Sequence, residues 1–202
     1  MTRLGLFGGT FNPPHLAHKM LALRAAEAAN LDTVLIMPDA EPPHKVSSGL
    51  ISGGDRLELC RRTFTEPVFQ VSDLELRRTG KSYTVDTVRE VQKLYAPDAL
   101  HLIIGSDMLL TFHQWRDYET ILSMAKLIVL SRETDILPDD LAAFAETVLG
   151  LSRENGDLLI LTDLPQVLSS TAIRERVRAG EAIDGLVTDA ANAYIKEKGF
   201  YR

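Results

Sequence analysis

The sequence predicts a parallel, doubly wound α/β sheet of the Rossmann-like class. Short apolar segments typical of strands alternate with longer segments in which apolar residues recur every three or four positions, as they do in helices. Two of the short segments, 100–104 and 127–130, are apolar at almost every position. Such runs are expected for strands that are buried on both faces of a parallel sheet. Strands and helices that alternate at this spacing are joined by right-handed crossovers.

The predicted strands are bounded by glycine, proline or polar turn residues. The first strand breaks at Gly8 and Gly9, the second ends at Pro38, and Pro67 precedes the third. These residues interrupt extended structure, so they set the limits of each strand. The predicted strands cover residues 4–7, 33–37, 68–71, 100–104, 127–130 and 158–161.

Helical segments separate these strands. Ser52 is a favourable N-cap for one of them, Asn30 ends another, and Pro138 occupies a first turn, where its missing N–H costs nothing. The segment 75–81 is charged and turn-like. The predicted helices cover residues 16–29, 54–64, 82–95, 108–112, 118–124, 138–149, 168–180 and 189–198.

The bulk composition favours one globular domain, residues 1–202. The apolar fraction of 45% supports a full core, and the net charge of −6 argues against a nucleic-acid polymer as the main partner. A small phosphorylated ligand needs only a local cluster of donors. The single cysteine, Cys60, and the lack of a signal segment or a long apolar stretch predict a cytoplasmic chain without membrane association. Whether it forms a homo-oligomer is left open.

Unusual polar clusters follow the predicted strands at their carboxyl ends. In doubly wound sheets ligands bind beyond these ends, so we expect the clusters to line one cleft. They are the segments 8–18, 42–45 and 105–107, together with Arg132.

The first cluster, residues 8–18, joins a strand to a helix through a glycine turn. Glycine lets the backbone approach a ligand closely, and the N–H groups of a helix start carry partial positive charge. His15 and His18 are three positions apart at this start, which places their Cβ atoms roughly 5–6 Å from each other. The histidine spacing does not fit a zincin, and neither a P-loop nor the Gly-x-Gly-x-x-Gly dinucleotide fingerprint is present.

A second cluster lies at the start of another predicted helix. Ser169, Ser170 and Thr171 are three consecutive hydroxyl residues that can cap a helix or bind phosphate. Arg174, one turn further on, offers a fork of donors to anionic oxygens. Each cluster alone is compatible with a purely structural role, and their joint presence favours a phosphate site.

The two clusters resemble paired signatures of the HxGH-type nucleotidyltransferases. The first is similar to Gly-Gly-x-Phe-x-Pro-x-His-x-Gly-His, with Ala17 in the place of the last glycine, and the second is similar to Ile-Ser-Ser-Thr-x-Ile-Arg, with Leu168 in the place of the first isoleucine. Along nearly its full length the chain resembles the bacterial nicotinate-nucleotide adenylyltransferase family; some members carry an aromatic residue where this chain has Arg116. The residues that carry the resemblance are 8–18, 42–45, 82–84, 104–107, 115, 118–120, 168–174 and 199–202.

This resemblance implies transfer of the adenylyl group of ATP to nicotinate mononucleotide, with release of pyrophosphate. His15, His18 and Arg174 are the implied catalytic residues, and Mg²⁺ rides mainly on the ATP phosphates, with no dedicated metal site in the protein. On the acceptor side the resemblance implies Lys45, Thr84, Trp115 and Arg132. The implied ATP contacts are Gly8, Gly9, Thr10, Phe11, His15, His18, Gly105, Asp107, Ser169, Ser170, Thr171, Ile173 and Arg174.

Two alternatives stay open from the sequence. Another adenylyltransferase would use nicotinamide mononucleotide or phosphopantetheine as the acceptor. A protein of a different class would bind a nucleotide without catalysis. The presence of both histidines together with Lys45 and Arg174 speaks against the second alternative, because binding alone does not require groups that stabilise a transition state.

Overall fold

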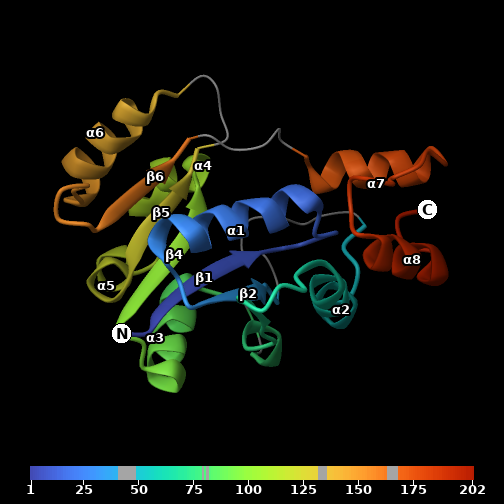
Figure 1. Ribbon diagram of the computed structural model, residues 1–202, viewed down its shortest axis with the longest axis horizontal. Coiled ribbons are helices and arrows are strands. Elements are labelled where there is room, and N and C mark those ends of the chain that lie inside the picture. The colour runs from blue at the N-terminus through green and yellow to red at the C-terminus, as the bar shows by residue number, and fades with distance from the viewer. Residues whose placement is uncertain (41–48, 79, 81, 132–135, 163–167) are drawn as a thin grey trace.

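The computed structural model describes residues 1–40, 49–78, 80, 82–131, 136–162 and 168–202. Its centre is one sheet of six strands, all paired in parallel, in the order β3-β2-β1-β4-β5-β6 (Figure 1). The predicted doubly wound α/β class is confirmed. The strands are β1 Arg3–Gly9, β2 Thr33–Pro38, β3 Phe69–Val71, β4 Ala99–Gly105, β5 Lys126–Leu130 and β6 Leu158–Leu161.

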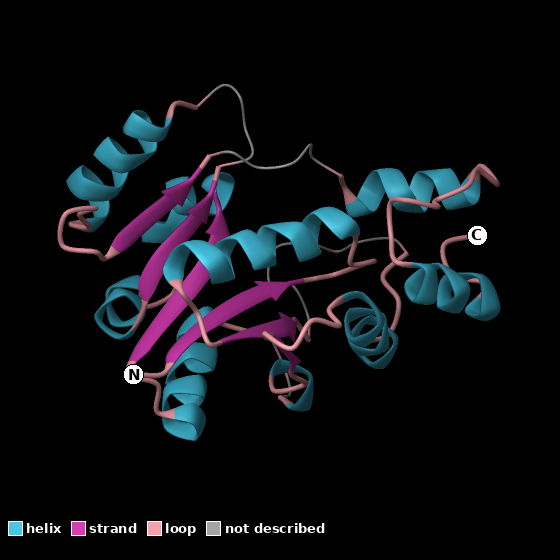
Figure 2. Cartoon of the chain, viewed as in Figure 1, coloured by secondary structure: helices cyan, strands magenta, loops and turns pink. Residues whose placement is uncertain are grey.

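Helices connect the strands and lie on both sides of the sheet (Figure 2). A 3-10 turn, Glu75–Arg77, occupies the segment predicted as a charged turn. The helices are α1 Leu16–Ala29, α2 Gly53–Thr63, α3 Thr84–Tyr95, α4 Ser106–Thr111, α5 Tyr118–Met124, α6 Pro138–Leu149, α7 Ser170–Arg178 and α8 Asp189–Lys198.

Among the helix starts that differ from the prediction, the caps explain those of α4 and α7. Helix α4 begins at Ser106, directly after β4, because Gly105 serves as its N-cap. Helix α7 begins at Ser170, two residues later than predicted, because the side chain of Ser169 accepts the backbone N–H of Ala172 and so caps the helix.

Two apolar clusters cover the two faces of the sheet, and a third joins the C-terminal helices to α2. Helices α3, α4, α5 and α6 pack on one face, and α1 and α2 pack on the other. In the third cluster, Leu59 of α2 meets Ile173 of α7 and Ile195 of α8. Residues from the end of the chain are thereby held beside α2 and the start of α1. Among the described residues, no helix is both long and apolar enough to cross a membrane.

The sheet has its switch point between β1 and β4. From β1 the chain continues to β2 on one side, whereas β4 lies on the other side and leads on to β5. The segments that follow β1 and β4 therefore diverge, and a crevice opens at the carboxyl ends of these strands. The predicted clusters after Gly9 and after Gly105 both lie here.

Candidate active site at the carboxyl edge of the sheet

The two histidines of the first cluster cap helix α1 together. His15 is the N-cap: its Nδ1 accepts the backbone N–H of His18 at 3.2 Å, and Nδ1 of His18 accepts the backbone N–H of His15 at 3.3 Å. The rings stack with centroids 3.6 Å apart and planes 18° from parallel. Because both Nδ1 atoms accept, the proton of each neutral ring lies on Nε2. The cap thus fixes the tautomer of each neutral ring, with its N–H at Nε2.

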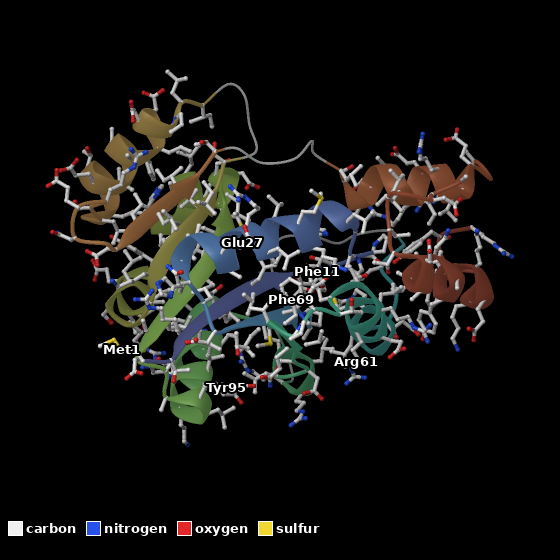
Figure 3. All side chains as sticks on the ribbon, viewed as in Figure 1. Met1, Phe11, Glu27, Arg61, Phe69 and Tyr95 are labelled. Carbon is white, nitrogen blue, oxygen red and sulfur yellow. The ribbon has the colours of Figure 1, made fainter. Side chains whose placement is uncertain are left out.

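The aromatic ring of Phe11 supports this pair. Phe11 is buried, has a left-handed φ of 48°, and meets the His18 ring edge-on at 5.2 Å. In Figure 3 Phe11 lies beside the first turns of α1, far from Met1 at the opposite end of the strands. The buried ring of Phe11 therefore packs against the turn between β1 and α1.

The two glycines that end β1 meet different surroundings. A Cβ atom on Gly9 would lie 3.2 to 3.4 Å from the ring of Phe11, which already fills that space. A Cβ atom on Gly8 would have only the Met37 carbonyl oxygen near it, at 4.0 Å, and Gly8 is exposed. The protein's own packing accounts for glycine at position 9. Packing within the protein does not explain the glycine at position 8, because the space beside this residue is open to solvent.

This difference gives a paired prediction. Gly8→Ala is expected to leave the free energy of unfolding within about 0.5 kcal/mol of the wild-type value and to raise the KM for ATP. Gly9→Ala is expected to destabilise the fold by about 1–3 kcal/mol through overpacking against Phe11. Urea unfolding together with ATP-dependent kinetics checks both variants. Unchanged ATP kinetics in a stable Gly8→Ala variant would contradict close approach of ATP to this glycine.

The second cluster contacts the first directly. Ser170 Oγ donates to the Pro13 carbonyl oxygen at 2.8 Å, and Arg174 donates through one terminal nitrogen to the Asn12 carbonyl oxygen at 2.9 Å. The other terminal nitrogen of Arg174 donates to Thr171 Oγ1 at 3.1 Å. Two segments separated by 157 and 162 residues along the chain are therefore one piece of surface.

Asn12 is a positioning residue that the sequence did not single out. Its side chain is buried, accepts the hydroxyl of Tyr201 at 2.9 Å and donates to the Gly49 carbonyl oxygen at 3.1 Å. Burial also raises the pKa of Tyr201, so its phenol remains a donor at neutral pH. The penultimate residue of the chain thus helps to fix the carbonyl group that Arg174 contacts.

Arg56 is a second residue that sequence reasoning missed. It is only 1% exposed and pairs with Asp39 at 3.0 Å, just beyond β2. The guanidinium also donates to the carbonyl oxygens of Thr10, Asp39 and Ala40, at 2.8, 2.7 and 3.2 Å. Thr10 Oγ1 donates in turn to the Asp39 carboxylate at 2.8 Å. Arg56 therefore ties the turn after β1 to the residues after β2.

Gly105 and Asp107 lie at the end of the neighbouring strand. The β1–β4 pairing reaches Phe7 and Ile103, and Gly9 and Gly105 each follow two residues later. Asp107 is exposed in the first turn of α4. The side chain of Ile173 has a different environment: it is 1% exposed and belongs to the apolar cluster of α2, α7 and α8. That side chain packs α7, so a contact of residue 173 with ATP would come from its backbone.

The predicted acceptor residues lie in two neighbouring segments. Ser82 Oγ accepts the backbone N–H of Ala40 at 3.4 Å, which places the start of α3, with Thr84, beside the end of β2. The Arg116 guanidinium lies 4.7 Å from the centroid of the Tyr83 ring, so the segment around Trp115 adjoins that helix start. Trp115 itself stacks on Phe112 at 4.7 Å and is partly exposed. The predicted contacts Lys45 and Arg132, and the segment 42–45, lie outside the described residues.

The cysteine offers no nucleophile to this site. Cys60 is fully buried on α2, and burial raises the pKa of its thiol far above the usual value. A protonated thiol is a poor nucleophile. The described part of the chain also contains no group of three or more His, Cys, Asp or Glu side chains that could hold a metal ion.

Known proteins resemble this chain over most of its length. The model of the cytidylyltransferase-like family matches residues 6–176. A protein of Trichlorobacter lovleyi, named as a probable nicotinate-nucleotide adenylyltransferase, is 39% identical over 211 residues, with 99% of each chain covered. A protein of Gemmatimonas aurantiaca with the same name is 40% identical over 202 residues, covering 99% of this chain and 92% of its own. The chain belongs to the nicotinate-nucleotide adenylyltransferase family.

Solved structures share the fold of this family member. The nicotinic acid mononucleotide adenylyltransferase of Plasmodium falciparum complexed with NaAD superposes with a TM-score of 0.76 at 14% identity, covering 100% of this chain and 98% of its own. The same protein complexed with APC gives a TM-score of 0.74, also at 14% identity, with 100% and 98% covered. The arrangement of strands and helices is therefore similar across a wide range of sequences.

Proposed function

We propose that this chain transfers the adenylyl group of ATP to nicotinate mononucleotide, giving nicotinate adenine dinucleotide and pyrophosphate. One observation carries the proposal beyond family membership: Arg174 and Ser170 bond to the carbonyl groups of Asn12 and Pro13, next to the histidine pair. In this proposal the donors to the α-phosphate, in the first cluster, lie beside the donors to the leaving pyrophosphate, in the second cluster. Such a transfer needs positioning and neutralisation of charge, which this site is built to provide.

The reaction is a single in-line displacement. A phosphate oxygen of the mononucleotide forms a bond to the α-phosphorus of ATP, and the bond from this phosphorus to the bridging oxygen of pyrophosphate breaks with its electron pair. No covalent intermediate with the protein is required. The protonated, buried thiol of Cys60 agrees with this scheme.

The first cluster holds the reacting phosphate. His15 and His18 donate from Nε2 to the non-bridging oxygens of the α-phosphate, which gain charge in the transition state. The backbone N–H groups near Thr10 and Phe11 and the positive end of α1 act on the same oxygens. Gly8 and Gly9 let the phosphate approach, and Gly105 and Asp107 line the nucleotide pocket from β4.

The second cluster holds the leaving group. Arg174 and the hydroxyls of Ser169 and Thr171 bind the β- and γ-phosphates, and Ser170, whose hydroxyl donates to the Pro13 carbonyl oxygen, contributes its backbone N–H. The side chain of Ile173 keeps α7 in place. Mg²⁺ carried on the ATP phosphates would supply further neutralisation of charge beside these donors. The fit of the described residues to this arrangement lies in the donors they offer to phosphate oxygens, above all the guanidinium of Arg174.

On the acceptor side, Trp115 stacks on the pyridine ring, and Thr84 with nearby backbone N–H groups binds the carboxylate. Lys45 and Arg132 contact the phosphate of the mononucleotide. The cation–π contact of Arg116 with Tyr83 holds the Trp115 segment against α3.

We further propose that residues 1–202 form one domain and that the protein works in the reducing cytoplasm, in keeping with its single, buried cysteine.

An acceptor panel tests the function. The protein is incubated with ATP, Mg²⁺ and one of three acceptors: nicotinate mononucleotide, nicotinamide mononucleotide or phosphopantetheine. We expect pyrophosphate release to be fastest with nicotinate mononucleotide. Faster release with another acceptor would favour one of the alternative adenylyltransferases, and no release with any of them would favour a nucleotide-binding module.

Removal of the arginine charge tests the role of the second cluster. Arg174→Ala is expected to lower kcat/KM for ATP at least about tenfold, because the leaving pyrophosphate loses a charged donor. Arg176→Ala, two residues further along α7, is the matched control: this arginine is exposed, and its one ion pair within the described part of the chain is with Glu181, at 3.4 Å. Steady-state kinetics of both variants make the comparison, and equal rates would disprove the role of Arg174.

A further inference from the structure

A basic pocket lies at the amino ends of the strands, at the opposite edge of the sheet from the candidate active site. Its volume is about 260 Å³. In Figure 1 the N-terminus marks this edge, and α7 and α8 lie at the far side of the molecule. The lining comes from the starts of four strands, the end of α1 and the loop before β6. Its charged and titratable lining residues are Arg3, His101, Lys126 and Arg153.

Sheet register brings three of these side chains together. His101 on β4 is paired with Lys126 on β5 and with Gly5 on β1. Directly paired residues of neighbouring strands project from the same face, and alternate residues of one strand share a face. Arg3, two residues before Gly5, therefore projects from the face that carries His101 and Lys126. This is the face covered by α1.

The positive charge of this pocket is poorly compensated. Within the described residues, neither Arg3 nor Lys126 forms an ion pair; the Arg3 guanidinium donates to the Ala29 carbonyl oxygen at 3.3 Å. Arg153 pairs with Asp139 at 3.4 Å, and the Asp139 side chain is 94% exposed. An ion pair this open to water is weak. The pocket is thus a local cationic site on a chain whose net charge is −6.

His101 adds a buried polar atom to the pocket. Its Nδ1 atom makes no hydrogen bond of good geometry among the described residues, although the Leu4 backbone lies close enough to the ring to oppose the lowering of its pKa. Burial, followed by the charges of Lys126 and Arg3, lowers the pKa of His101, so the ring is neutral at pH 7. A buried polar atom without a partner is costly, and a bound ligand is one way to compensate it. Because the pKa of His101 depends on the charges around the ring, the signals of this ring should report the binding of an anion in the pocket.

The volume of the pocket and its cationic donors indicate which class of ligand it could bind. A volume of about 260 Å³ is just below the roughly 300–1,000 Å³ of pockets that enclose drug-sized ligands, which favours a small ligand or one group of a larger ligand. The guanidinium groups of Arg3 and Arg153 and the ammonium of Lys126 match the several oxygens of a phosphate group. We propose that this pocket binds a phosphate-class dianion: free orthophosphate, free pyrophosphate or the terminal phosphate of a nucleotide. The proposal does not depend on the proposed function.

Anion titration followed by nuclear magnetic resonance of the histidine rings tests the proposal. The full chain is titrated with orthophosphate, pyrophosphate and AMP at constant ionic strength, and the His101 ring signals are monitored. We expect a saturable shift of these signals, and the tightest of the three anions distinguishes free phosphate from a nucleotide phosphate. Because His101 lies at the far edge of the sheet, anions that bind in the active site are distinguished from anions in this pocket.

Two variants and one control make the result decisive. Lys126→Met and Arg153→Met are each expected to weaken the binding reported by His101 at least about tenfold, equivalent to about 1.4 kcal/mol. Using both keeps the test informative if one variant fails to fold. Lys93→Met, an exposed lysine on α3, is expected to change the affinity less than twofold. No saturable shift with any of the three anions, or equal affinity in the folded variants and the control, would overturn the proposal.

Discussion

Replacing His18 by alanine is expected to lower kcat at least about a hundredfold, equivalent to roughly 2.7 kcal/mol of barrier height. The physical reason is the loss of a donor whose tautomer is fixed by the capping pair: Nδ1 of His18 accepts the His15 backbone N–H, which makes Nε2 the donor. Steady-state kinetics with ATP and nicotinate mononucleotide measure the effect. The exposed His113 provides the matched control, and His113→Ala is expected to retain normal turnover.

The cap and the catalytic role of His18 can be separated. His18→Ala also removes half of the capping box, which costs about 0.5–2 kcal/mol of stability. Glutamine is favourable at the same position of a capping box. His18→Gln is therefore expected to recover thermal stability without recovering turnover. Normal turnover in either folded variant would show that the imidazole does not act on the transition state.

Replacing Arg56 by methionine is expected to lower the free energy of unfolding by about 3–5 kcal/mol, because it leaves a largely buried carboxylate without its partner. The Asp39 side chain is only 16% exposed, and three backbone carbonyl groups lose a donor at the same time. One of them belongs to Thr10, so the turn that we propose binds phosphate should loosen too. Urea unfolding measures the stability, and a raised KM for ATP would report the loosened turn.

A matched control and a rescue sharpen this prediction. Arg61 lies on the same helix, is largely exposed and meets Glu58 only at 3.9 Å, so Arg61→Met should change stability by less than about 0.5 kcal/mol. The double variant Arg56→Met, Asp39→Asn should recover part of the loss, because the unpaired charge is removed. If Arg56→Met unfolds at the same urea concentration as Arg61→Met, the buried ion pair does not stabilise the fold.

Local signals account for the elements that the sequence predicts well. Helix α1 has its predicted limits because Asn30 adopts a left-handed conformation and ends it. Helix α6 likewise begins at Pro138 and ends at Leu149, because the next residue, Gly150, adopts a left-handed φ of 68°. Such caps depend only on a few neighbouring residues, so they can be recognised without the tertiary structure. The carboxyl-edge location of the glycine turn and of Gly105 follows equally from the alternation of strands and helices.

Contacts between distant residues account for what the sequence did not reveal. Arg174 meets Asn12 across 162 residues of chain, and no local pattern encodes the bond between that side chain and that carbonyl group. Arg56 gave one local signal: it shares a helix face with Leu59 and Cys60, three and four residues on, and apart from Thr63 the other buried residues of this helix are apolar. An arginine within an apolar stripe indicates a buried partner, but its partner Asp39 is known only from the fold.

Transfer of a labelled phosphorus atom tests the central claim most directly. ATP radiolabelled at the α-phosphorus is incubated with the protein, Mg²⁺ and nicotinate mononucleotide, and the products are separated. The account predicts label in nicotinate adenine dinucleotide, an equal amount of unlabelled pyrophosphate, and neither product when the mononucleotide is omitted. Label that stays in ATP, or that appears as AMP without an acceptor, would contradict adenylyl transfer by this site.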